Sequence, residues 1–233
     1  AKSSEKLHKS ESKLRKLTFV FTVRKLKKIL KIEKPDILHA HYASSYGYIC
    51  ALTKYKPLIV SVWGSDIYSF PHSSFITKKI IKYTLSKATR IFSTSNDMAR
   101  EANLYTDKKI DVTPFGVDTN IFNNSDKRLF FSKDYIVIGT VKNLEINSGI
   151  DYLLKAFSLL KAKQFNKPVK LVIIGDGAES ENLKNFAKNL NIANDVIFTG
   201  KVDYNKIVDC FSSFDIYAVP SLFESFDVAV LEA

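Results

Sequence analysis

The sequence predicts an α/β protein in which two doubly wound, Rossmann-like domains follow one another along the chain. Three observations support this fold class: short apolar strands alternate with helical segments, the alternation stops once near the middle, and the charge balance changes there. Apolar strands that alternate with helices indicate a parallel sheet covered by helices on both faces.

Seven apolar, mostly β-branched runs predict the strands, and helical segments separate most of them. The predicted strands are Asp36–Ala40, Leu58–Trp63, Arg90–Thr94, Tyr135–Val141, Lys170–Ile174, Val196–Thr199 and Asp215–Val219. The predicted helices are 74–87, 96–104, 149–164, 180–190 and 204–213. A further amphipathic helix, from Leu14 to Lys31, precedes the first strand.

Residues 114–134 interrupt this alternation with a cluster of Pro, Gly, Asn, Asp and Ser, which are turn and loop formers. We therefore predict a first domain over residues 1–113, a linker over 114–134 and a second domain over 135–233. The chain starts without an opening strand–helix unit and stops early in an apolar helix. We accordingly expect both domains to be incomplete.

The net charge of +11 is unevenly distributed. Residues 1–135 carry 25 Lys and Arg against 12 Asp and Glu, whereas residues 136–233 carry 10 against 12. Such a split fits a nucleic acid, an anionic membrane surface, or a lysine-rich composition without a partner. The basic residues lack the glycine and aromatic residues that accompany them in RNA-binding segments. We therefore predict no nucleic-acid partner. Two explanations of the charge remain, an anionic membrane surface and a lysine-rich composition that has no partner.

The predicted N-terminal helix has one apolar face, which either covers the first sheet or lies on a membrane. Its residues are Leu14, Leu17, Phe21, Leu26, Ile29 and Leu30. No apolar run reaches the roughly 20 residues that span a bilayer, and the polar first residues do not resemble a signal peptide. Cys50 and Cys210 are expected to be free, buried thiols. These features predict a cytoplasmic location, peripheral on the inner face of the cell membrane.

Four segments together resemble the GT4-type, group 1 glycosyltransferases. They are DVTPFGVDTNIF (Asp111–Phe122), IGTVKNLEINSGIDYLLKAF (Ile138–Phe157), LVIIGDGAESENL (Leu171–Leu183) and the stretch from Val196 to Ala233. The resemblance covers about residues 35–233, and the order and spacing of the segments make it specific. It implies a retaining transferase with a GT-B fold, in which two Rossmann-like domains face each other across a cleft. It also implies a UDP- or GDP-linked sugar as co-substrate, a glycan or lipid-linked acceptor of the cell envelope, and no metal or other cofactor.

Glu224 and Glu232 form the pattern E-x7-E at the end of the chain. In the resembling family the first glutamate accepts hydrogen bonds from sugar hydroxyls at the reacting centre, and the second accepts them from the ribose. A spacing of eight predicts that the two side chains lie two turns apart on nearly the same face of one helix. The alternative is that Glu224 is an ordinary charge at a helix N-terminus and that Glu232 is solvated.

The resemblance assigns the other donor contacts to two loops and to the turn that follows the strand at Lys170–Ile174. That turn is Gly175-Asp176-Gly177. A contact with the nucleotide and a purely structural role explain its sequence equally well. The loop contacts are Lys142, Asn143, Ser148, Ser225, Phe226 and Asp227.

Three of these positions depart from the family pattern. Asn143 stands where the family has arginine, Ser148 where it has lysine, and Asp227 where it has glycine. Each change weakens a diphosphate site, because two cations are lost and a carboxylate is added. Lys142 or Lys201 could compensate, although Lys142, which is adjacent to Asn143, can also point the other way. The alternative hypothesis is therefore a degenerate glycosyltransferase-like fragment, or a non-catalytic subunit that binds sugar or protein.

The acceptor side is assigned to the first domain, where two motifs end predicted strands. His39 and His41 flank Ala40, and alternation sends both imidazoles to one face. They could bind a metal, but no third ligand is evident, and the resemblance instead places such a histidine (we choose His41 as catalytic) near the cleft. The second motif is Trp63, Gly64, Ser65 and Asp66, where many relatives have histidine first. Trp63 cannot replace that histidine as an acid or a base, and Asp66 either caps the next segment or binds the acceptor.

Overall fold

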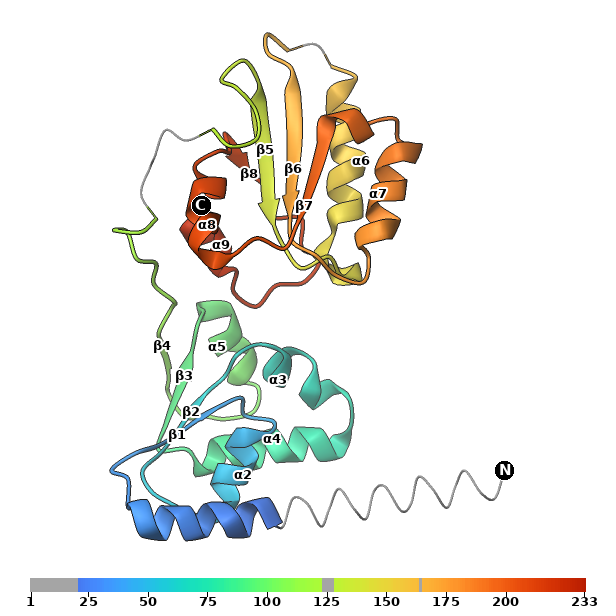
Figure 1. The fold of residues 1–233 in the computed structure, drawn as a ribbon. Coiled ribbons are helices and arrows are strands. Elements are labelled where there is room, and N and C mark those ends of the chain that lie inside the picture. Colours follow the sequence, from blue (N-terminus) through green and yellow to red (C-terminus); the bar gives the residue numbers. More distant parts are fainter. Residues whose placement is uncertain (1–20, 123–127, 164) are drawn as a thin grey trace. The chain divides into compact units, whose positions relative to one another are not determined.

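The chain forms two compact units, Ala1–Phe115 and Gly116–Ala233 (Figure 1). The computed structural model describes residues 21–122, 128–163 and 165–233 of the chain. The division falls inside the stretch 114–134, whose assignment as an interdomain linker stays a prediction.

The N-terminal unit is built on a parallel sheet of order β1-β2-β3-β4. Its strands are β1 (Leu38–His41), β2 (Leu58–Ser61), β3 (Arg90–Ser93) and β4 (Ile110–Val112), joined by α2 (Tyr46–Thr53), α3 (Ser65–Tyr68), η1 (Phe70–His72), α4 (Phe75–Lys87) and α5 (Asn96–Ala102). Strand β4 and helices α2 and α3 were not predicted. Because β1, β2 and β3 pair in parallel and in sequence order, their carboxyl ends lie at one edge of the sheet.

Residues 21–33 are helical and precede β1. Leu30 is buried and Leu26 packs against the core of the N-terminal unit. Both contacts agree with the prediction that this helix covers the first sheet. The predicted apolar face is wrong for Phe21 and Ile29, which are 67% and 43% exposed. Leu14 and Leu17 lie outside the described residues. No helix among the described residues is long and apolar enough to cross a membrane.

The C-terminal unit is a parallel sheet of order β7-β6-β5-β8 with helices on both faces (Figure 1). Its elements are β5 (Ile136–Val141), η2 (Ile146–Ser148), α6 (Ile150–Lys161), β6 (Val169–Ile174), α7 (Ser180–Asn189), η3 (Ala193–Asp195), β7 (Val196–Gly200), α8 (Tyr204–Phe211), β8 (Ile216–Tyr217) and α9 (Val228–Glu232). Leu154 and Leu183 bring α6 and α7 onto one face. Ile207 and Ala229 bring α8 and α9 onto the other. The predicted doubly wound α/β architecture is confirmed.

The strand order of the C-terminal sheet reverses at β5. The chain moves outward from β5 to β6 and β7, then returns to the other side of β5 to form β8. In open parallel sheets, ligands bind outside the carboxyl ends of the strands at such a reversal. The loops that follow β5 and β8 therefore frame the expected ligand position.

Residues at the end of the predicted linker pack onto the C-terminal unit. Arg128 donates to both carboxylate oxygens of Asp215, at 2.7 and 3.1 Å. Phe130 stacks on Phe214 with ring centroids 6.3 Å apart. Cys50 and Cys210, one in each unit, are free and buried as expected.

Candidate functional site

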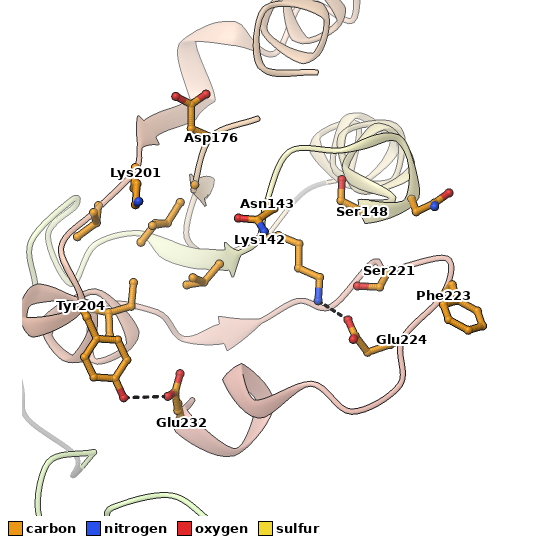
Figure 2. A pocket seen from close by; sticks show the side chains of 16 residues that line it. Lys142, Asn143, Ser148, Asp176, Lys201, Tyr204, Ser221, Phe223, Glu224 and Glu232 are labelled. Atoms are coloured by element: carbon orange, nitrogen blue, oxygen red, sulfur yellow. Dashed lines mark hydrogen bonds and ion pairs between the residues drawn. The ribbon is translucent and has the colours of Figure 1, made fainter. Parts of the chain in front are cut away.

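A cavity of about 840 Å³ lies at the carboxyl ends of β5 and β6 in the C-terminal unit (Figure 2). Seven of the predicted donor residues line it: Lys142, Asn143, Ser148, Gly175, Asp176, Glu224 and Glu232. Of the described residues, Gly177, Ser225, Phe226 and Asp227 are not among those lining it. The cavity falls within the roughly 300–1,000 Å³ that is typical of small-molecule sites, and we call it the donor cavity.

Lys142, the first residue after β5, points into the donor cavity toward Glu224 (Figure 2). Its Nζ donates to Glu224 Oε2 at 2.6 Å and to Asp227 Oδ2 at 2.7 Å. Lys142 therefore lines the same cavity as its neighbour Asn143. Because β5 ends at Val141, strict strand alternation no longer sets the direction of these side chains. Burial lowers the pKa of Lys142, but the hydrogen bonds to Asp227 and Glu224 outweigh it and the pKa is raised.

Asp227 lies at the N-cap of α9 and holds the loop that carries Glu224. One carboxylate oxygen accepts the backbone N–H of Ala229 at 3.1 Å, and the other accepts Lys142 Nζ. Its side chain is only 11% exposed. The carboxylate that replaces the family's glycine is thus paired with a cation, which offsets the repulsion that an unpaired carboxylate would exert on a diphosphate.

The two glutamates of the E-x7-E pattern do not lie on one helix, which corrects the sequence-based expectation. Glu224 lies in the loop before α9, and Glu232 is the last residue of that short helix. Both side chains nevertheless line the donor cavity. The loop is extended because Asp227 caps α9 from a β-region backbone, so the helix begins only at Val228.

Gly175 brings two strand ends together beneath the donor cavity. Its φ is +131°, and a Cβ at this position would lie 1.9 Å from the carbonyl oxygen of Lys142. Only glycine fits this close approach. The glycine therefore has a structural role in placing Lys142 and Asp176 at the same edge. Gly177 contacts the backbone of Leu144 instead.

Two of the three departures from the family pattern differ in their surroundings. Asn143 lines the donor cavity directly. Ser148 is buried, and its hydroxyl donates to the carbonyl of Glu145 at 2.6 Å. Ser148 nevertheless lines the donor cavity as well, so it lies at the cavity wall with its hydroxyl tied to the backbone.

A second pocket, of about 300 Å³, lies in the N-terminal unit at the carboxyl ends of β1, β2 and β3. We call it the histidine pocket; it is lined by His39, His41, Ser61, Val62, Trp63, Phe92, Ser93, Thr94, Thr113 and Phe115. The imidazole centroids of His39 and His41 lie 4.4 Å apart, which confirms that they share a face. Among the described residues, no group of three or more His, Cys, Asp or Glu is placed to hold a metal ion.

Trp63 contacts the histidine pair directly. Its indole N–H donates to His41 Nδ1 at 2.9 Å, while His39 Nε2 lies 2.8 Å from Ser61 Oγ. Burial, together with the neighbouring His41, lowers the pKa of His39. The two imidazoles are thus held in a fixed network in which His39 favours its neutral form.

Asp66 holds two loops together and does not cap the helix that follows, since Gly64 is the N-cap of α3 and no side chain caps it. It is 1% exposed, and its carboxylate accepts the backbone N–H groups of Ala43, Trp63 and Gly64 at 2.7, 3.0 and 2.9 Å. Burial raises its pKa, against the effect of these hydrogen bonds. Asp66 therefore fixes the two loops that carry Tyr42 and Trp63. Neither it nor Gly64 nor the exposed Ser65 is among the described residues that line the histidine pocket.

Two family models together match most of the chain. The model of glycosyl transferases group 1 matches residues 122–233, and the glycosyl transferase 4-like model matches residues 3–95. The chain belongs to the group 1, GT4-type glycosyltransferases. The resemblance stated from the sequence motifs is confirmed, and the boundary between the two matches lies close to the division between the two units.

Curated relatives of this group 1 glycosyltransferase chain have different acceptors in their names. The phosphatidylinositol N-acetylglucosaminyltransferase gpi3 subunit of Schizosaccharomyces pombe is 25% identical over 86% of the chain and 44% of its own length. The N-acetyl-α-D-glucosaminyl L-malate synthase of Bacillus anthracis is 24% identical over 90% of the chain and 56% of its own length. The chain therefore spans about half the length of these relatives.

Solved structures show that the group 1 glycosyltransferase chain has the GT-B type of fold. The sucrose-phosphate synthase of Thermosynechococcus elongatus superposes with a TM-score of 0.72 at 16% identity, over 90% of this chain and 56% of that one. The pneumococcal O-GlcNAc transferase GtfA, in complex with UDP and GlcNAc, superposes with a TM-score of 0.63 at 17% identity. That match covers 89% of this chain and 42% of the transferase.

Several residues that line the donor cavity of this group 1 family member were not singled out from the sequence. Tyr204 donates its hydroxyl to Glu232 Oε1 at 3.3 Å (Figure 2). Ser221 and Phe223 come from the loop after β8. Lys201, which the sequence did suggest as a compensating cation, follows β7 and also lines the cavity. Each of these residues follows a parallel strand or starts the helix after it. Because the strands are parallel, these positions lie at one edge of the sheet, and this placement is the signal that the sequence offered.

Proposed function

We propose that this chain is part of a retaining glycosyltransferase that takes a UDP- or GDP-linked sugar. Its acceptor is a glycan or lipid-linked molecule of the cell envelope. The observation that carries the proposal is the donor cavity at the strand reversal, where Glu224, Glu232 and Lys142 converge. The relative whose structure holds UDP and GlcNAc supports the choice of a nucleoside diphosphate sugar.

Each of the three charged residues has a chemical role in this proposal. Glu224 accepts hydrogen bonds from hydroxyls of the donor sugar, because an ionised carboxylate is a strong acceptor. Glu232 does the same for the ribose, with Tyr204 holding its carboxylate in place. Lys142 turns from its two carboxylates to the diphosphate when the donor enters, because it is the cation that lies beside Glu224.

The reaction proceeds on one face of the sugar ring. The acceptor hydroxyl attacks C1 while the bond from C1 to the diphosphate oxygen breaks, and the hydroxyl proton passes to the leaving diphosphate. His41 lies on the acceptor side and donates a hydrogen bond there. Backbone N–H groups and Lys142 stabilise the charge that develops on the leaving group. No metal or other cofactor is part of the proposal.

Replacement of Glu224 tests the site assignment. In the full-length protein, Glu224→Ala should reduce transfer from UDP- and GDP-sugars by about 100-fold or more, in line with the loss of charge-assisted contacts in the transition state. Glu181→Ala, on the exposed face of α7, removes an equal charge away from the cavity and serves as the control. Unchanged transfer by Glu224→Ala would refute the assignment.

We also propose that the protein rests on the cytoplasmic face of an anionic membrane. The helix of residues 21–33 exposes Phe21, Ile29 and Ile32 at 67%, 43% and 76%. Lys25 and Lys28 lie on the same side of the helix by spacing, and such a basic, apolar surface favours anionic lipid. Sedimentation with vesicles of phosphatidylglycerol should exceed that with phosphatidylcholine, and Ile32→Glu should abolish the difference. Equal sedimentation with both lipids would contradict the proposal.

The second candidate is that the protein is a non-catalytic relative with a weakened diphosphate site. Asn143 and Asp227, which replace the family's arginine and glycine, favour this alternative. The double variant Asn143→Arg, Asp227→Gly restores the family's residues at these two places. An active enzyme transfers sugar without these two replacements, whereas a decayed site should transfer none until they are made. Ser148 is left unchanged in this experiment, because it is buried.

A further inference from the structure

The C-terminal unit carries a cluster of lysines at the end of its sheet opposite the donor cavity. Four lysines lie between Lys161 and Lys170, and no Asp or Glu occurs from Tyr152 to Gly175. This stretch contains most of α6, the loop that follows it and β6. Residues 136–233 as a whole hold 10 Lys and Arg against 12 Asp and Glu. The cluster is therefore not part of the general excess of lysine in the chain.

A cavity of about 370 Å³ lies inside this cluster, at the amino end of β6. We call it the lysine pocket; it is lined by Lys161, Lys163, Phe165, Lys167, Pro168 and Val169. The donor cavity lies at the carboxyl end of the same strand and shares none of these residues. The six residues of β6, at about 3.3 Å per residue, place roughly 17 Å of strand between the two. The lysine pocket is thus a separate site.

The positive charges of the lysine pocket are only partly balanced. Lys161 Nζ lies 3.0 Å from Asp195 Oδ2. In the part of the chain that the structure describes, neither Lys163 nor Lys167 pairs with a carboxylate, and Lys167 Nζ donates to the carbonyl oxygen of Lys133 at 2.8 Å. The C-terminal end of α6 contributes about half a negative charge through the helix dipole. Two ammonium groups against this half charge leave a surplus of roughly 1.5 positive charges in the pocket.

The remaining walls of the lysine pocket are apolar. Phe165 is 47% exposed, Pro168 is exposed and Val169 is buried. A half-exposed aromatic ring gains contact area when a flat ring lies against it. A phosphate monoester carries about 1.5 to 2 negative charges at neutral pH, which matches the surplus of the lysines, whereas a carboxylate carries one. The pocket therefore combines a site for a doubly charged anion with a wall for a ring.

We propose that the lysine pocket binds a phosphate monoester carried on a flat ring, as in a nucleoside monophosphate. Lys163 and Lys167 bind the phosphate group, while the ring lies against Phe165 and Pro168. The volume of about 370 Å³ is near the lower end of small-molecule sites, so the pocket admits one such molecule rather than a polymer. The inference goes beyond the proposed transferase function and does not depend on it.

Phenyl phosphate is the probe that tests this inference. It combines the charge with a flat ring and lacks the ribose that the donor cavity is proposed to recognise. Calorimetric titration of the intact chain, with and without saturating UDP, should give the same dissociation constant, on the order of 0.1–1 mM. Inorganic phosphate lacks the ring and phenol lacks the charge, so each should bind at least about tenfold more weakly.

Lysine variants assign the binding to the pocket. Lys163→Gln together with Lys167→Gln removes both cations that lack a carboxylate partner, and the affinity for phenyl phosphate should fall at least about tenfold. Lys184→Gln together with Lys188→Gln removes the same charge from α7 and should leave the affinity unchanged. Thermal unfolding of both double variants checks that the fold is retained.

A variant of the aromatic wall tests the ring contact separately. Phe165→Ser should weaken the binding of phenyl phosphate about fivefold, while the binding of inorganic phosphate stays unchanged. Leu159→Ser is the matched control, because it removes a 73% exposed apolar side chain from α6 outside the pocket. A loss of affinity for both anions in Phe165→Ser would contradict the stacking of the ring.

Equal affinity for phenyl phosphate and inorganic phosphate would overturn the inference, because the lysines would then act as non-specific cations. Displacement of phenyl phosphate by UDP would place the probe in the donor cavity and overturn it as well. So would unchanged affinity in the variant of Lys163 and Lys167. Dependence on these two lysines of binding to phosphatidylglycerol vesicles or to oligouridylate, without binding of phenyl phosphate, would replace the proposed ligand by a membrane or a nucleic acid.

Discussion

Lys142 Nζ lies 2.7 Å from Asp227 Oδ2, so the residue that breaks the family's glycine pattern is the ion-pair partner of the cation in the donor cavity. The same ammonium group lies 2.6 Å from Glu224. One positive charge therefore holds two carboxylates that would otherwise repel each other. A diphosphate that enters the cavity has to compete with both of them for Lys142.

Neutralising Asp227 should strengthen nucleotide binding. Asp227→Asn removes one competing charge, and asparagine remains a good N-cap for α9, so the loop keeps its anchor. We expect the affinity for UDP or GDP to rise about tenfold, ~1.4 kcal/mol, measured by isothermal titration calorimetry. Asp151→Asn, which removes an equal charge from the surface of α6, should leave the affinity unchanged. Weaker binding by Asp227→Asn would mean that Asp227 itself contacts the ligand.

Removing Lys142 should have the opposite effect. Lys142→Met keeps the aliphatic chain but deletes the cation beside Glu224. Loss of a charge-assisted contact to a diphosphate corresponds to about 1.5–3 kcal/mol, so nucleotide affinity should fall by about ten- to a hundredfold. Lys155→Met, on the exposed face of α6, is the control. If nucleotide affinity survives in Lys142→Met, another group holds the diphosphate and Lys201 becomes the candidate.

The fold could be predicted from the sequence where burial on both faces leaves a continuous apolar run. Strand β6 is such a case, since Leu171, Val172, Ile173 and Ile174 are all buried. Strand β4 escaped prediction because it has only three residues and carries Asp111 in its centre. Helix α2 escaped because it contains Gly47 and no capping side chain, so it depends on packing rather than on local signals.

The candidate site was predictable in its residues but not in its geometry. The motifs identified Glu224, Glu232 and Lys142, and all three line one cavity. The direction of Lys142 depends on where β5 ends, and the separation of the glutamates depends on where Asp227 starts α9. The end of β5 and the start of α9 are set by contacts between distant segments. The periodicity of residues within one segment carries no information about such contacts.

Asp66 should contribute to stability more than to ligand binding. Asp66→Ala leaves three backbone N–H groups without their acceptor, those of Ala43, Trp63 and Gly64. Since an unsatisfied buried donor costs about 1–3 kcal/mol, we expect a loss of at least about 3 kcal/mol in the free energy of unfolding, measured with urea. Asp97→Ala, which removes an exposed carboxylate from α5, should have a smaller effect. Near-equal stability of wild type and Asp66→Ala would contradict the role of Asp66 in holding the two loops.

The pairing of Arg128 with Asp215 should make the stability of the C-terminal unit sensitive to acid. The hydrogen bond from Arg128 holds the pKa of Asp215 below its ordinary value. A carboxylate with a lowered pKa stabilises the fold above its unfolded pKa of about 3.9, and this contribution is lost as the pH falls through the folded pKa. Asp215→Asn should therefore cost about 1 kcal/mol at neutral pH, in the range of a partly exposed ion pair.

The difference between wild type and Asp215→Asn should then shrink as the pH falls below about 4, because both chains become neutral at this position. Urea unfolding over a pH series measures this difference, and Asp134→Asn, which removes an exposed carboxylate just before β5, is the control. A gap that stays constant into acid would show that Asp215 acts through the neutral hydrogen bond to the N–H of Val137 alone, without the charge of Arg128.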